Sequence, residues 1–259
     1  MFVQPPCRLG LIGGFDLQID DRPSSIGDGG ARLLTLLALS GRHRAVSRQS
    51  AAERLWCDDG TRAPARLRNT LWRLPRTELG PLVVGSGASL QLADHVEVDV
   101  WAAEDTAHAL DGDGDQAERF DLRPFAQDLL PEWPEDWLVL ERESFRQTRL
   151  HALERASSRL CAQGSHAAAL QAALTAVACE PLRETAQCRV VEAHLAEGNH
   201  AEALRQYQSY RRLLAAELGL APTPAMRRLV GPLLGRPVDH FAPAPVRSAQ
   251  SRPDPRHDG

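Results

Sequence analysis

The chain has 259 residues, of which 43% are apolar and 25% charged, and its formal net charge is −4. This length allows two domains with separate cores, and no apolar run approaches the ~20 residues that a membrane-spanning helix needs. The N-terminus shows no export signal, and the five cysteines form neither a CxxC pair nor a disulfide framework. We therefore expect a cytoplasmic protein with reduced thiols and no membrane partner.

The charges are unevenly distributed along the chain. Residues 42–76 contain nine arginines and three acidic residues, a net charge of +6. Residues 94–144 contain sixteen acidic residues and three arginines, a net charge of −13. A basic segment within an acidic protein points to a polyanionic partner for that segment alone, although a charged run without further pattern is more often a solvated surface.

The first ninety residues combine short strands with helices. Residues 7–27 alternate β-type runs with glycine, proline and aspartate, which predicts two or three strands. Residues 30–41, GARLLTLLALSG, are apolar on most sides and predict a buried helix. A second helix is predicted over residues 47–56, with Ser47 as its N-cap.

A third helix and a hairpin complete this region. The helix is predicted in the arginine-rich segment 64–77, PARLRNTLWRLPRT. Residues 82–92 contain two β-type runs around a Gly-Ser-Gly sequence, which predicts a hairpin. Strands followed by three helices and a hairpin are typical of a winged helix-turn-helix domain, which we place at residues 1–97.

The remainder of the chain is predicted to be helical. The segments 161–170, CAQGSHAAAL, and 195–204, LAEGNHAEAL, match at six of ten positions and lie 34 residues apart. That period is characteristic of tetratricopeptide helix pairs, in which a turn glycine lets adjacent helices pack closely. We therefore expect a mainly α protein with a small β component, in which an all-α tetratricopeptide-like domain at residues 98–235 follows the winged helix. Residues 236–259 are rich in proline, serine and charge and are expected to be disordered.

The arginine-rich helix has one apolar and one basic side. On a helical wheel, three leucines point within about 40° of one direction: Leu67, Leu71 and Leu74. The opposite half collects Ala65, Arg66, Asn69, Trp72 and Arg73, with Arg68 on the flank. Arginine forms bidentate hydrogen bonds with guanine and asparagine with adenine. Because the third helix of a winged helix-turn-helix lies in the major groove, we interpret this face as DNA-reading.

Other arginines flank this helix. Arg44 and Arg48 lie at the start of the second helix, where the helix N-terminus favours an anion, and are predicted to contact phosphate. Arg62 and Arg76 join the basic face if the helix extends, but Pro75 limits it, so Arg76 is expected to contact only the DNA backbone. The predicted DNA-binding residues are Arg44, Arg48, Arg62, Arg66, Arg68, Asn69, Arg73 and Arg76.

Two features leave alternatives open. Trp72 on the outward face can stack on sugar or protein, or be buried if the helix rolls, and we favour the structural role. The hairpin tip, Gly85-Ser86-Gly87, has no basic side chain to insert into a minor groove, so a hairpin without a DNA role is at least as well supported.

Catalytic and metal-binding motifs are absent from the sequence. It contains no nucleophile elbow, Walker loop, zinc-protease motif or dinucleotide-binding turn. The run DGDGD at residues 111–115 begins like a calcium loop, but the glycine and the glutamate that such a loop requires are replaced by Gln116 and Leu122. We predict no catalytic residue, no cofactor and no bound metal.

Several segments resemble one family of regulators. In the first domain these are AVSRQSAAERLW, LRNTLWRL and the hairpin that follows. In the second they are DVWAAE, GSHAAALQAALTAVACEPLRETA and EGNHAEALRQYQSYRRLLAAELGLAPTPAMRRL. The chain resembles the Streptomyces antibiotic regulatory protein family, in which a winged helix-turn-helix domain precedes a bacterial transcriptional activation domain. It departs from the family in Trp72, in Pro75 and in the second strand of the hairpin, ASLQL, which lacks an aromatic residue.

The resemblance implies a transcriptional activator. Such proteins bind direct repeats in double-stranded DNA beside promoters, self-associate on that DNA and recruit RNA polymerase holoenzyme, often to switch on a biosynthetic gene cluster. The resemblance implies that the helix with Arg66, Asn69 and Arg73 reads the DNA. The main alternative is a protein-interaction adaptor whose winged helix no longer reads DNA, and an enzyme with an unrecognised site is a weaker one.

Overall fold

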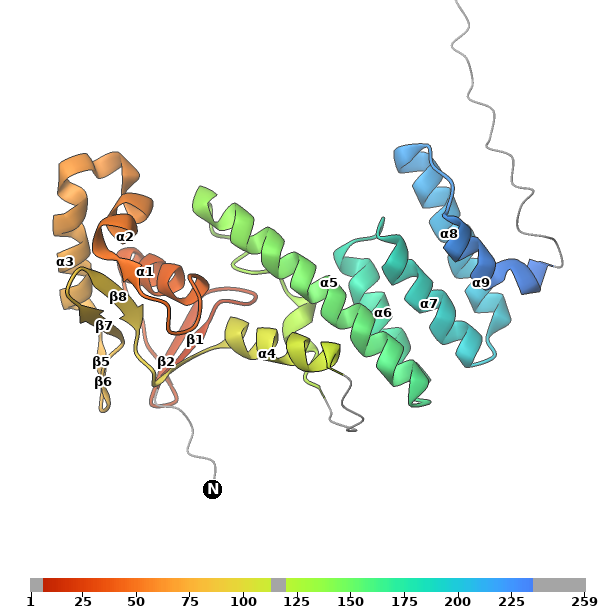
Figure 1. Ribbon diagram of the computed structural model, residues 1–259, viewed down its shortest axis with the longest axis horizontal. Helices are drawn as coiled ribbons and strands as arrows, with labels where there is room; N and C mark the ends of the chain where they lie inside the picture. Colours follow the sequence, from red (N-terminus) through yellow and green to blue (C-terminus); the bar gives the residue numbers. More distant parts are fainter. Residues whose placement is uncertain (1–6, 113–119, 235–259) are drawn as a thin grey trace, which may run out of the picture.

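A computed structural model describes residues 7–112 and 120–234 (Figure 1). The predicted disordered tail and most of the acidic segment tested for a calcium loop lie outside these residues. The described chain forms an N-terminal unit of strands and helices, residues 7–98, and a helical unit, residues 99–234. The domain boundaries predicted after residues 97 and 235 stay predictions.

Short strands open the N-terminal unit, as predicted. Strands β1 (Cys7–Gly10), β2 (Asp16–Ile19), β3 (Arg22–Pro23) and β9 (Val96–Val98) form a sheet in the order β3-β2-β1-β9. Neighbouring strands are antiparallel except β1 and β9, which run parallel. Because β9 follows the whole helical and hairpin region, its pairing brings residue 98 beside the start of the described chain.

The first helix contributes many of the buried leucines of the core. Helix α1 (Asp28–Leu39) buries leucines on several sides, which confirms the prediction of a buried helix. Helix α2 (Arg48–Leu55) follows strand β4 (Val46–Ser47). The Ser47 hydroxyl accepts a hydrogen bond from the backbone N–H of Ser50 over 3.0 Å, so the predicted N-cap is confirmed.

A third helix and two hairpins complete the winged helix-turn-helix arrangement. A 3-10 turn, η1 (Cys57–Arg62), leads into helix α3 (Ala63–Arg73). The predicted hairpin is confirmed as β7 (Val83–Ser86) and β8 (Ser89–Leu92), and β4 pairs with β8 to give a sheet of order β4-β8-β7. A further small hairpin, β5 (Arg76–Thr77) and β6 (Gly80–Pro81), was not predicted.

The helical unit consists of helices packed in sequence order. They are α4 (Asp99–Asp111), α5 (Val139–Ala162), α6 (His166–Cys179), α7 (Glu184–Ala196), α8 (His200–Leu218) and α9 (Pro224–Leu234), with 3-10 turns η2 (Arg123–Ala126) and η3 (Asp136–Leu138) before α5. From α5 to α8 each helix packs on the next, as Figure 1 shows.

The turn glycines of the predicted repeat have left-handed backbones. Gly164 has a φ of 76° and Gly198 a φ of 80°, a conformation that glycine adopts without strain. Each lies just before the helix that its repeat begins, α6 or α8, and these helices start 34 residues apart. The predicted tetratricopeptide-like pairing of helices is confirmed.

One carboxylate ties the two units together. Asp99, the first residue of α4, accepts hydrogen bonds from the backbone N–H groups of Leu11 and Ile12, each over 2.9 Å. Burial raises the pKa of Asp99 above its ordinary value, and these N–H donors oppose that shift only in part. Two residues further along α4, the indole N–H of Trp101 donates to the Ala38 carbonyl of α1 over 2.9 Å.

The loop before α5 strengthens this joint from the other side. The backbone N–H of Leu130 donates to the Leu11 carbonyl, and that of Gly13 to the Asp128 carbonyl. Arg149 of α5 is almost fully buried, donates to the Phe125 carbonyl over 2.9 Å and pairs with Asp128. One apolar core therefore runs from β1 through α1 into α5, and a smaller core lies between α7, α8 and α9.

We predict that Asp99→Ala lowers the free energy of unfolding by about 2–4 kcal/mol, since two N–H groups lose their acceptor. Guanidinium chloride unfolding monitored by circular dichroism measures the change. The matched control is Asp105→Ala, which removes an exposed carboxylate of the same helix that pairs with Arg42 and should cost less than about 1 kcal/mol. Equal losses in the two variants would contradict the role assigned to Asp99.

Candidate nucleic-acid interface

Helix α3 has the two sides that the sequence predicts. Ala63 and Leu67 are buried and Leu71 is partly buried against the core, and Leu74, just beyond the helix, packs there as well. Leu74 leaves the helical conformation with φ −63° and ψ 138°, as expected for the residue before Pro75. The helix therefore ends at Arg73, and its other side faces solvent.

The solvent-facing side carries the predicted cluster of donors. Its exposed residues are Ala65, Arg66, Arg68, Asn69, Trp72 and Arg73. Within the part of the chain that the structure describes, Arg68 and Arg73 form no ion pair with an acidic side chain. Their guanidinium groups therefore have all of their donors available for a partner.

Arg66 differs from the other arginines of α3. Its Nη1 pairs with the carboxylate of Asp59, a partner that the sequence analysis missed. Asp59 lies in the 3-10 turn before the helix, and Gly60, with a φ of 49°, bends the chain between them. A helical wheel of α3 contains no acidic residue that could pair with Arg66. The signal for this ion pair in the sequence was therefore the pair Asp58-Asp59, which precedes the helix.

Arg48 holds the hairpin to the start of α2. Its Nε donates to the Gly87 carbonyl over 3.3 Å, and its backbone N–H donates to the Ala88 carbonyl over 2.7 Å. The guanidinium also passes close to Gly85, where a Cβ would lie 2.7 Å from Nη2. Arg48 thus fixes the position of the hairpin tip beside α3.

A groove separates the end of α3 from the two hairpins. Its volume is about 520 Å³, and its base is formed by apolar side chains such as Leu71, Leu82 and Leu90. Arg48, Arg68 and Arg76 line the same groove from α2, α3 and β5. Three predicted DNA-binding arginines that are distant in sequence are therefore brought together.

The remaining predicted residues lie around this surface. Arg44 is exposed in the turn between α1 and β4, and Arg62 is exposed at the end of the 3-10 turn. Arg76 lies in β5, beyond the end of α3, as Pro75 predicted. Their roles in DNA binding stay predictions.

The favoured structural role for Trp72 is wrong. The side chain is 86% exposed, the most exposed of the large apolar residues in the described chain. The helix does not roll to bury it, because Ala63 and Leu67 already fill the position against the core. Trp72 instead occupies the middle of the basic face.

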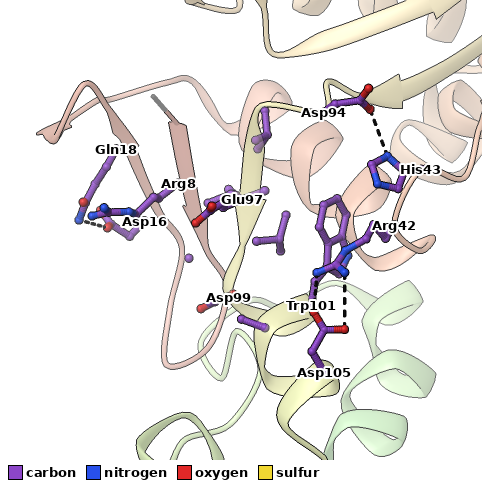
Figure 2. Close-up of a pocket in the computed structure, with 15 residues that line it drawn as sticks. Arg8, Asp16, Gln18, Arg42, His43, Asp94, Glu97, Asp99, Trp101 and Asp105 are labelled. Atoms are coloured by element: carbon purple, nitrogen blue, oxygen red, sulfur yellow. Dashed lines mark hydrogen bonds and ion pairs between the residues drawn. The ribbon is translucent and has the colours of Figure 1, made fainter. Parts of the chain in front are cut away.

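A second hollow lies at the joint between the two units, and Figure 2 shows its lining side chains. Its volume is about 650 Å³. The guanidinium of Arg42 lies over the Trp101 ring, 5.5 Å from its centre, and donates to Asp105 over 2.9 Å. His43 lies 3.1 Å from Asp94. The Arg42–Asp105 pair crosses the joint and helps to hold it, whereas His43 and Asp94 both belong to the N-terminal unit.

Two kinds of feature are absent from residues 7–112 and 120–234. No group of three or more histidine, cysteine, aspartate or glutamate side chains is arranged there to hold a metal ion. No helix in those residues is long and apolar enough to cross a bilayer.

Comparison with known proteins identifies the family. The model of the bacterial transcriptional activator domain matches residues 98–234. The chain belongs to this family. Its resemblance to the Streptomyces antibiotic regulatory protein family is confirmed.

Two curated relatives from this family cover most of the chain. Regulatory protein AfsR of Streptomyces coelicolor is 30% identical over 86% of this chain, and AfsR of Streptomyces griseus is 29% identical over 82%. The chain spans about a quarter of the length of these relatives, 24% and 23%.

A solved structure shares the fold. Mycobacterium tuberculosis EmbR, in complex with a low affinity phosphopeptide, matches with a TM-score of 0.68 and 19% identity. The match covers 90% of this chain and 66% of the EmbR chain. The predicted fold class, a winged helix-turn-helix followed by a tetratricopeptide-like domain, is confirmed.

We predict that Trp72→Ala changes the free energy of unfolding by less than about 0.5 kcal/mol, because the side chain is exposed. Leu67→Ala, on the buried side of the same helix, should cost about 2–4 kcal/mol. Thermal and denaturant unfolding of both variants measures the difference. A large loss in Trp72→Ala would mean that the indole packs against the protein.

Proposed function

We propose that the chain is a sequence-specific DNA-binding transcriptional activator that inserts α3 into the major groove. It binds direct repeats near promoters, self-associates there and recruits RNA polymerase holoenzyme, activating a biosynthetic gene cluster. The observation that carries the proposal is the exposed face of α3, which presents Arg68, Asn69 and Arg73. Neither arginine pairs with an acidic side chain among residues 7–112 and 120–234. Family membership supports the transcriptional part of the proposal.

The donors on α3 suit the edges of base pairs. A guanidinium matches the O6 and N7 of guanine, and an asparagine amide matches the N6 and N7 of adenine. Arg68, Asn69 and Arg73 are assigned to these contacts. Arg66 joins them when DNA replaces Asp59 as its partner, at the cost of an exposed ion pair worth less than about 1 kcal/mol.

The surrounding arginines are assigned to phosphates. Arg48 and Arg76 line the groove beside α3, Arg44 lies in the turn before β4, and Arg62 lies at the end of η1. Phosphate contacts fix the register of a protein on DNA without reading sequence, so these four arginines supply affinity and orientation. The tip of the β7–β8 hairpin offers only backbone and small side chains to a minor groove.

The helical unit is assigned to protein contacts. It is tied to the N-terminal unit through Asp99 and the Leu11 backbone, so binding of α3 to DNA also sets the direction of helices α5–α9. A second protomer on the adjacent repeat and the polymerase would then meet this unit in a fixed orientation. The proposed activity requires no catalytic residue, cofactor or metal and acts on the chromosome in the cytoplasm.

We predict that Arg68→Ala combined with Arg73→Ala lowers affinity for the selected sites by at least about 30-fold, because two base contacts are lost and each contributes about 1–3 kcal/mol. The measurement is sequencing of genomic fragments retained by the purified protein at moderate salt, followed by titration of the enriched sites. The matched control is Arg211→Ala combined with Arg212→Ala, which removes the same charge from exposed positions of α8.

The same experiment distinguishes a DNA-binding activator from a protein-interaction adaptor. A DNA reader enriches promoter fragments with a repeated motif, and only the α3 variant loses them. If wild type and the α3 variant retain the same unselected fragments, or none, the arginines form a solvated face and the adaptor interpretation replaces the proposal.

We predict that Asp59→Ala strengthens binding by up to about fivefold, since Arg66 no longer exchanges an ion pair for a DNA contact. Asp58→Ala is the matched control: it removes the same charge from the adjacent, exposed position, which forms no ion pair among the described residues. Fluorescence anisotropy titrations of an enriched site compare the two. Equal gains would mean that general charge, and not Arg66, causes the effect.

A further inference from the structure

Trp72 gives the basic face an apolar centre. Ala65 lies two helical turns before it on the same side of α3, so the two residues form an apolar line along the helix. The exposed polar residues Arg68, Asn69 and Arg73 flank this line. An indole that is 86% exposed costs free energy in water, and a partner that covers it regains that energy.

We propose that Trp72 recognises the 5-methyl group of a thymine in the major groove, so that the DNA site requires a T·A pair at one fixed position. The proposal rests on the proposed function, because it requires α3 to lie in that groove. The thymine methyl is the apolar group that base pairs present there, and apolar side chains contact it. The flanking arginines and asparagine bind the polar edges that an indole cannot satisfy.

The surroundings of Trp72 favour DNA over a protein partner. A stable protein interface buries about 800 Å² on each side with an apolar centre, whereas the exposed neighbours of Trp72 on α3 are arginine, asparagine and alanine. Trp72 also lines the groove that Arg48, Arg68 and Arg76 share. A basic rim around an exposed aromatic side chain complements a phosphate-bordered groove with a methyl group inside it.

The position of the thymine follows from helix geometry. Trp72 lies three residues after Asn69, which corresponds to about 4.5 Å along the helix axis. One base-pair step is about 3.4 Å, so the contacted thymine lies about one step from the pair that Asn69 contacts. The enriched motif should therefore contain an invariant thymine beside the pair assigned to Asn69.

A chemical double-mutant cycle tests the proposal. A duplex library with a random 20-bp centre is first enriched on the wild-type chain, and the preferred duplex is then synthesised with each thymidine replaced, one at a time, by deoxyuridine. This replacement removes only the methyl group. At one position in each repeat, affinity for the wild type should fall about fourfold, as expected for one methyl group buried against apolar surface.

Variants assign that loss to Trp72. In Trp72→Ala the same replacement should leave affinity unchanged, and the cycle then isolates the indole–methyl contact. Leu140→Ala is the matched control, because it truncates an apolar side chain of α5 that is 79% exposed, and it should behave as wild type. The dependence of affinity on salt should be the same in Trp72→Ala and wild type, since no charge is removed.

The outcomes distinguish failure of the thymine contact from failure of the proposed function. If no deoxyuridine position weakens wild-type binding, or if the loss persists in Trp72→Ala, the thymine contact is wrong while sequence-specific binding stands. If the wild-type chain enriches no sequence from the library, the proposed function itself fails, and the thymine contact fails with it.

Discussion

The architecture depends on the carboxylate of Asp99. It accepts the backbone N–H groups of Leu11 and Ile12 at the point where strand β9 ends and helix α4 begins. Strand β9 also pairs in parallel with β1, so this pairing and the Asp99 hydrogen bonds together fix where the chain leaves the first sheet and enters α4. Burial raises the pKa of this carboxyl, and its N–H donors compensate part of the cost of holding the charge there. A hinge between the units would require these buried donors to lose their acceptor.

This joint determines which surface of α3 is free. The N-terminal unit packs Ala63 and Leu67 of α3 inward and joins the helical unit through α1, the first sheet and α4, on other sides of the core. The face with Arg68, Asn69 and Trp72 is consequently left to solvent. In Figure 1 α3 lies at one end of the molecule, and α8 and α9 lie at the other. DNA on α3 and protein on the helical unit would therefore not compete for the same surface.

Local signals in the sequence were sufficient for most elements. The Ser47 N-cap, the leucine spacing of α3, the stop before Pro75 and the glycines of the 34-residue repeat each depend on residues a few positions apart. Contacts between distant residues were not predictable in this way. The bond from Leu11 to Asp99 spans 88 positions.

The basic segment shows the same limit. Its net charge counts Arg42 and Arg66, yet Arg42 pairs with Asp105 and Arg66 with Asp59. A helical wheel predicted that Trp72 faces outward, and this is its position in the structure. The favoured structural role was wrong because the roll of α3 depends on its packing against the core, which the sequence does not give. The number of unpaired arginines on α3 is therefore smaller than the composition indicates, and its exposed face includes the indole of Trp72.

The most direct measurement is a crystal structure of the chain bound to a duplex enriched from promoter DNA. The account predicts α3 in the major groove, with Arg68, Asn69 and Arg73 contacting base edges and with Arg48 and Arg76 near phosphates. A complex in which α3 stays outside the groove, with DNA bound elsewhere on the chain, would contradict it.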